Sequence, residues 1–115
     1  MKKNTLLAFI LSLCAYTAFA GGNVDAGKLA AEKFNCASCH GANYSTPIDP
    51  TYPKLAGQHK DYIAQALKAY QRGADGANGR GNAIMGAQAK ALSNLDIQNI
   101  AAYLNSLPSS LVLKK

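Results

Sequence analysis

The sequence predicts an all-α fold with three main helices joined by long loops. Three stretches place apolar residues at the i, i+3, i+4, i+7 spacing of an amphipathic helix, and no stretch alternates like a β-strand. The connecting segments carry three prolines (41–58) and five glycines (73–86). Because a small domain with such loops has little apolar surface to share, the pattern predicts a fold wrapped around a large apolar group.

Each predicted helix follows from its apolar positions and from the residues that would end it. The apolar faces comprise, in chain order, Gly27, Ala30, Ala31 and Phe34; Ile63, Ala66, Leu67 and Tyr70; and Ile97, Ile100, Ala101 and Leu104. Asn23 or Asp25 can cap the first helix, and Gly73 can end the second. Ser93 opens a capping-box pattern for the third helix, which Pro108 should stop.

The first twenty residues have the pattern of a secretory signal peptide. Lys2 and Lys3 precede a short apolar stretch, and Ala18-Phe19-Ala20 is a small-x-small cleavage signature. We therefore expect residues 1–20 to be removed and residues 21–115 to form one domain in the periplasm. The apolar stretch is short for a membrane span, and no later segment is longer, so the mature chain should have no transmembrane segment.

Charge and composition exclude some classes of function. The formal net charge of +6 falls to +4 once Lys2 and Lys3 are removed, which is too small to indicate nucleic-acid binding. A mild basic excess suits docking on an acidic protein surface. Glu32 is the only glutamate, so an enzyme built on paired carboxylates has few candidate residues.

The segment Cys36-Ala37-Ser38-Cys39-His40 carries the chemistry. The pattern C-x-x-C-H is typical of covalent haem c attachment. On a helix, Cys36, Cys39 and His40 stand at i, i+3 and i+4 and so share one face. Two thiols can then bond the haem vinyl groups while the imidazole of His40 binds the iron. The motif predicts one haem c, attached through Cys36 and Cys39.

Three other interpretations of the two cysteines compete with haem attachment. A thioredoxin-like dithiol needs a βαβ setting that this sequence lacks. A small disulfide is plausible in an exported chain. A zinc site would need Cys36, Cys39, His40 and the distant His59, whereas zinc ligands normally come as two separated pairs. The residues favour haem over all three.

A second iron ligand must come from elsewhere in the chain. After residue 20 there is one other histidine, His59, and one methionine, Met85. Met85 lies in the glycine-rich segment before the last helix, where the chain can return to the far side of the haem. In most proteins a lone methionine simply fills space in the core. The remaining alternative is that the sixth coordination position of the iron is open.

Several stretches together resemble the class I c-type cytochromes, and most of all the short bacterial group that includes cytochromes c-four and c-five. The resemblance covers about Asp25 to Leu107. Its marks are Cys36–Gly41, Tyr52–Gln58, Arg80–Met85, Leu92–Ser93 and Ala101–Leu104. It implies the class I cytochrome c fold, with three main helices and long loops around one covalently bound haem.

The resemblance also implies roles for individual residues. The carbonyl of Pro53 should accept the Nδ1–H of His40, and Leu55 should wall the haem. Arg80 and Asn82 are candidates for holding a haem propionate or orienting the methionine loop. Because Pro53 lies on the side of His40, His59 in the same short loop is a poor sixth ligand, and we expect His40 and Met85 to bind the iron.

A further implied contact is the crossing of the first and last helices at Gly27 and Tyr103. The implied function is one-electron transfer between respiratory or dehydrogenase partners, without catalysis. The partners should be redox proteins with acidic docking surfaces, and the protein itself a monomer or weak dimer. A haem-c gas sensor and a cytochrome subunit of a periplasmic oxidoreductase are the alternatives.

Overall fold

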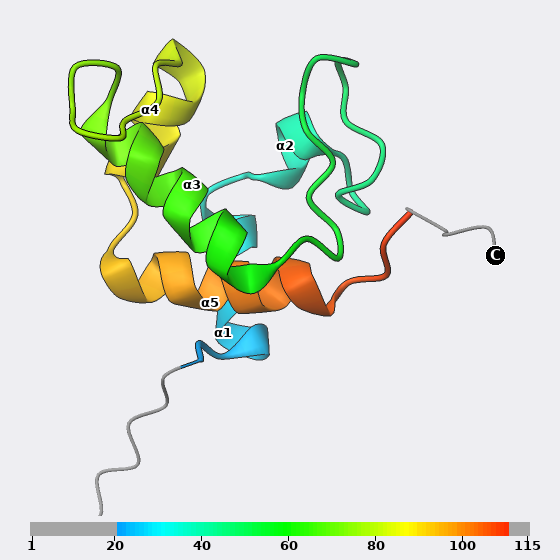
Figure 1. The fold of residues 1–115 in the computed structure, drawn as a ribbon. Coiled ribbons are helices and arrows are strands. Elements are labelled where there is room, and N and C mark those ends of the chain that lie inside the picture. Colours follow the sequence, from blue (N-terminus) through cyan, green and yellow to red (C-terminus); the bar gives the residue numbers. More distant parts are fainter. Residues whose placement is uncertain (1–20, 111–115) are drawn as a thin grey trace, which may run out of the picture.

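Five helices and their connecting loops make up the computed structural model, which describes residues 21–110. The expected signal peptide (1–20) and the tail 111–115 lie outside the described residues. The helices are, in chain order, α1 (Val24–Lys33), α2 (Ala37–His40), α3 (Lys60–Arg72), α4 (Ala83–Lys90) and α5 (Asn94–Ser106). Residues 21–110 contain no strand, so the all-α prediction is confirmed. Helix α5 lies between α1 and α3 (Figure 1).

The three main helices have the ends that the sequence predicts. Asn23, rather than Asp25, caps α1 by accepting a hydrogen bond from the amide of Ala26. Gly73 ends α3 with a positive φ of 73°, which glycine adopts without steric cost. Ser93 and Asp96 form a complete capping box at the start of α5, which ends at Ser106 before Pro108.

Helices α1 and α5 cross where Gly27 meets the last helix. A Cβ on Gly27 would overlap the carbonyl of Asn99 and lie 2.7 Å from the Cβ of Tyr103. The side chain of Asn99 also accepts a hydrogen bond of 2.8 Å from the amide of Asn23. The crossing implied by the resemblance, with glycine opposite Tyr103, is therefore present, and it requires glycine.

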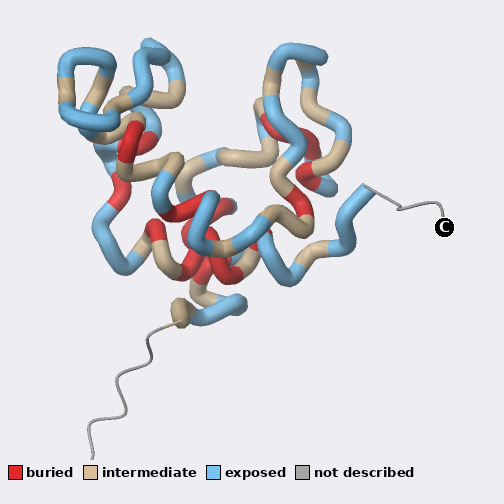
Figure 2. The backbone as a smooth tube through the Cα atoms, in the orientation of Figure 1, coloured by how far each residue is buried: buried red, intermediate tan, exposed pale blue. Residues whose placement is uncertain are grey.

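The hydrophobic core is built largely from small side chains. Its buried members centre on the crossing of α1 and α5 (Figure 2). Ile97 and Leu104 are the largest side chains described as fully buried, and many of the other core residues are alanines. Helix packing alone thus buries little apolar area. No helix within residues 21–110 is both long and apolar enough to pass through a membrane.

The segment before the last helix differs from the prediction. Residues 73–86 were expected to form a loop, but the chain becomes helical at Ala83 and stays so to Lys90. The reason is Asn82, whose side chain accepts a hydrogen bond from the amide of Met85 and caps α4. Met85 therefore lies in the first turn of a helix rather than in a loop.

Candidate cofactor site

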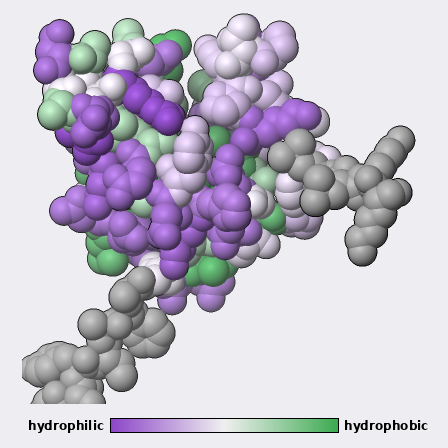
Figure 3. Space-filling model, in the orientation of Figure 1, coloured by the Kyte–Doolittle hydropathy of each residue, from purple (hydrophilic) through white to green (hydrophobic). Residues whose placement is uncertain are grey.

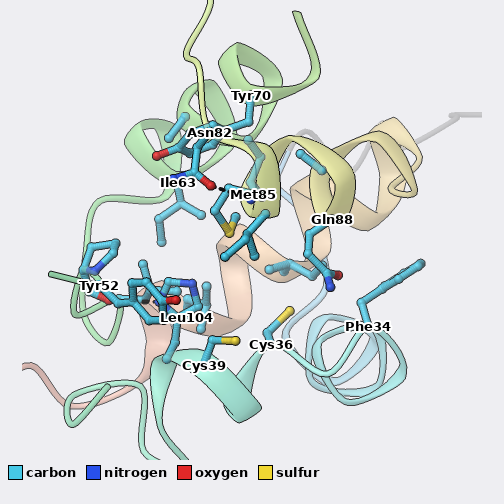
Figure 4. Close-up of a pocket in the computed structure, with 18 of the residues that line it drawn as sticks. Phe34, Cys36, Cys39, Tyr52, Ile63, Tyr70, Asn82, Met85, Gln88 and Leu104 are labelled. Atoms are coloured by element: carbon cyan, nitrogen blue, oxygen red, sulfur yellow. Dashed lines mark hydrogen bonds between the residues drawn. The ribbon is translucent and has the colours of Figure 1, made fainter. Parts of the chain in front are cut away.

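A cavity of about 320 Å³ lies between the loop that follows α2 and helices α3, α4 and α5. Every residue that the sequence suggested for the site lines it: Cys36, Cys39, His40, Pro53, Leu55, Arg80, Asn82 and Met85. Figure 4 shows Cys36 and Cys39 on one side of the cavity and Met85 on the other, with the sulfur of Met85 directed inward. His59 is exposed and lies outside the lining.

The two cysteines are placed by one turn of helix. Asn35, at a φ of 55°, lies in the turn that follows α1, and the carbonyl of Cys36 then accepts hydrogen bonds from the amides of Cys39 and His40. This turn brings both thiols to the cavity, and both are free rather than joined as a disulfide. Burial raises the pKa of the Cys36 thiol above its ordinary value.

His40 is fixed with one ring nitrogen occupied. The side chain is buried, with 7% of its surface exposed, and its Nδ1 lies 3.0 Å from the carbonyl oxygen of Pro53. Because a carbonyl oxygen can only accept, Nδ1 carries the proton in this bond. Nε2 is then the nitrogen with a free lone pair, as a metal-binding histidine requires.

Arg80 lies at the edge of the cavity against two tyrosines of α3. Its guanidinium carbon is 5.5 Å from the ring centroid of Tyr62 and 5.7 Å from that of Tyr70. Arg80 also donates a hydrogen bond of 3.3 Å to the hydroxyl of Tyr62. A guanidinium has five N–H donors, so most of its capacity to bind a carboxylate remains available.

Much of the cavity wall was not identified from the sequence as part of the site. The additional apolar and aromatic lining residues include Phe34, Tyr52, Tyr62, Ile63, Leu67, Tyr70, Ile100 and Leu104. Several of them belong to the apolar helix faces that the sequence does show. Helical spacing identifies such a face but does not distinguish packing against another helix from packing against a cofactor.

These residues fit a covalently attached haem. The cavity has an apolar wall for a porphyrin, two thiols one helical turn apart, an imidazole with a free nitrogen, and an arginine at the rim. In the described part of the chain, no three His, Cys, Asp or Glu side chains gather as a metal site. The zinc set of Cys36, Cys39, His40 and His59 is therefore not assembled.

Comparison with known proteins gives an independent result. The family model for cytochrome c matches residues 24–108. The chain is 40% identical over 81 residues to cytochrome c4 of Azotobacter vinelandii, which covers 70% of this chain and 38% of that protein. It is 42% identical over 72 residues to cytochrome c-554(548) of Halomonas halodenitrificans, covering 62% of this chain and 82% of that protein.

A third relative and one solved structure extend these matches. The thiosulfate dehydrogenase electron acceptor of Thiomonas intermedia is 38% identical over 79 residues, which is 69% of this chain and 34% of that protein. The crystal structure of reduced recombinant cytochrome c4 from Pseudomonas stutzeri superposes with a TM-score of 0.66 at 30% identity. That match covers 79% of this chain and 48% of the other, so the chain spans about half the length of its cytochrome c4 relatives.

Proposed function

Because the chain belongs to the cytochrome c family, we propose that it is a monohaem one-electron carrier whose iron is bound by His40 and Met85. The fold is that of a class I cytochrome c. Cys36 and Cys39 bind haem c covalently, as the family and the C-x-x-C-H spacing require. When bound, the haem supplies an iron that gains and loses one electron.

The protein's own residues account for the rest of the chemistry. The carbonyl oxygen of Pro53 accepts a hydrogen bond from Nδ1–H of His40. This bond orients the ring and makes Nε2 a stronger ligand. Met85 offers a thioether from the opposite side, and such a ligand favours the reduced state and raises the potential. Arg80 is placed to pair with a haem propionate, and the amide oxygen of Asn82 orients Met85 by accepting a hydrogen bond from its backbone amide.

The observation that supports electron transfer over catalysis is the placement of a side chain able to bind iron on each side of the cavity. Cys36 and Cys39 lie opposite the inward-pointing sulfur of Met85 in Figure 4, and His40 directly follows Cys39. If His40 and Met85 both bound the iron, neither side of it would be open to a substrate or a gas. A gas sensor or an enzyme would instead need a vacant or easily vacated position.

Carbon monoxide tests this proposal directly. The reduced holoprotein mixed with carbon monoxide should keep its visible spectrum over minutes, because Met85 blocks the iron. The Met85→Ala variant serves as the positive control and should bind carbon monoxide on mixing. Rapid binding by the unmodified protein would contradict the carrier assignment and favour the gas-sensor alternative.

The proposed setting is the periplasm, with an exported dehydrogenase or a respiratory complex as partner. The signal-peptide pattern of residues 1–20 supports export, and the relative that is named as a thiosulfate dehydrogenase electron acceptor supports a dehydrogenase as electron donor. The face in Figure 3 is mostly hydrophilic, with only small apolar areas, which suits a transient polar contact. We propose an acidic docking surface on the partner.

Electron exchange with an acidic redox protein should slow as salt is raised. The effect should be modest, since the two haem propionates offset part of the positive charge and screening acts within about 8 Å at physiological ionic strength. Exposed Lys54, at the cavity rim, should matter more than exposed Lys28 on α1. Stopped-flow measurements of the electron-exchange rate at several salt concentrations compare the Lys54→Gln and Lys28→Gln variants.

A rate that is flat across salt concentrations would contradict charge-guided docking. Equal slowing by Lys54→Gln and Lys28→Gln would show that overall charge matters, rather than a docking face at the cavity rim.

A further inference from the structure

Helix α4, which carries Met85, has few stabilising interactions within itself. It is eight residues long, and isolated helices of that length are marginal in water. Ala89 is its only buried residue, and Ile84 has 55% of its surface exposed. Asn82 caps the N-terminal end, but that bond is local and does not tie α4 to another helix.

Helix α4 packs against α3, and the hydrogen bonds between the two come from Gln71 near the end of α3. Its Nε2 donates a hydrogen bond of 2.8 Å to the carbonyl of Ala89 and one of 3.0 Å to the carbonyl of Leu92. In the described part of the chain, these are the only hydrogen bonds that join α3 to α4 or to the turn that follows it. They add a side-chain donor to the carbonyl of Ala89, which also accepts a hydrogen bond from the amide of Leu92, and one to the carbonyl of Leu92 itself.

The two bonds act on the sixth ligand through the helix. Met85 lies four residues before Ala89, and both residues line the cavity, so they share one face of α4. Gln71 holds this helix at its C-terminal end, while Asn82 holds the amide of Met85 at the N-terminal end. Loss of the Gln71 bonds would leave α4 free to tilt away from α3 and withdraw the sulfur.

We propose that Gln71 is a positioning residue that keeps the Met85 sulfur within reach of the iron. The inference rests on the proposed His40 and Met85 ligation. Gln71 does not contact the cofactor in this scheme. It sets how often α4 tilts away from α3, and thus how often the Met85 sulfur leaves the sixth position of the iron.

Two substitutions at Gln71 separate the hydrogen bonds from side-chain bulk. Gln71→Leu removes both donors at similar volume, and Gln71→Glu places carboxylate oxygens against the two carbonyl oxygens. Gln65→Leu and Gln65→Glu are matched controls, since Gln65 is an exposed residue of the same helix with no side-chain hydrogen bond in the described structure.

The measurements are made on the folded holoprotein. Two partly buried hydrogen bonds contribute enough that Gln71→Leu should raise the rate of carbon monoxide binding to the reduced protein about tenfold. Gln71→Glu should raise it further and weaken the methionine-to-ferric-iron absorption. Hydrogen exchange should quicken in residues 83–90 of both variants, and both Gln65 variants should match the unmodified protein.

Other outcomes have distinct meanings. Carbon monoxide rates equal to those of the Gln65 variants would overturn the proposal, including the case in which only the unfolding temperature falls, because a purely structural role predicts that result. Rapid carbon monoxide binding or a missing methionine absorption in the unmodified protein would overturn the His40 and Met85 ligation itself, and the positioning role with it.

Discussion

Replacing Met85 with Ala should abolish the methionine-to-ferric-iron charge-transfer absorption and lower the reduction potential sharply. The thioether stabilises the reduced iron, and axial ligands set haem potentials over a range of roughly 0.8 V, so removing one has a large effect. Met85 is the only methionine after residue 20, and no second thioether can replace it. Visible absorption of the oxidised protein and a redox titration measure the two effects.

His59→Ala is the control for this substitution. His59 is the other histidine of the chain, but it is exposed, precedes α3 and does not line the cavity. Both the absorption and the potential should therefore stay nearly unchanged. The reverse pattern, in which His59→Ala shifts the potential and Met85→Ala does not, would establish a haem with two histidine ligands and refute the methionine assignment.

Replacing both Cys36 and Cys39 with Ala should yield a chain without covalent haem that is largely unfolded. The core is dominated by alanines, with Ile97 and Leu104 as its largest fully buried side chains. A domain of this size with so little apolar burial has a small margin of stability, which the haem would supply. Acid–acetone extraction tests for covalent haem, and circular dichroism with heating tests for folding.

Ser38→Ala is the matched control, because it changes the same motif but leaves both thiols. It should retain haem through extraction and unfold cooperatively. Haem that resists extraction from the double variant would disprove attachment through these two residues. A cooperative thermal transition in the haem-free chain would show instead that the helices fold unaided.

The main helices could be predicted because local chemistry fixes them. Asn23, Gly73 and Ser93 each make a cap or a turn that depends only on nearby residues. The C-x-x-C-H motif is equally local, since one helical turn determines which side chains share a face. The sequence thus predicted the cysteines and His40 as a group before any long-range contact was known.

Contacts between distant segments could not be predicted in the same way. The helix that Asn82 caps could not be predicted, because the glycines on both sides of Asn82 favour a loop. The bonds from Gln71 to Ala89 and Leu92 depend on how α3 and α4 meet. The stacking of Arg80 on Tyr62 depends likewise on the course of the 73–79 segment, which spacing along the chain does not define.

The crossing of α1 and α5 has a consequence for the order in which the protein matures. The bond from Asn23 to Asn99 joins residues 76 positions apart, and Ile100 and Leu104 of α5 form part of the cavity wall. A chain that emerges from its N-terminus therefore presents Cys36 and Cys39 long before the cavity can exist. Because the haem-free chain is expected to stay largely unfolded, α5 should dock only after haem is attached, and both thiols should stay accessible until then.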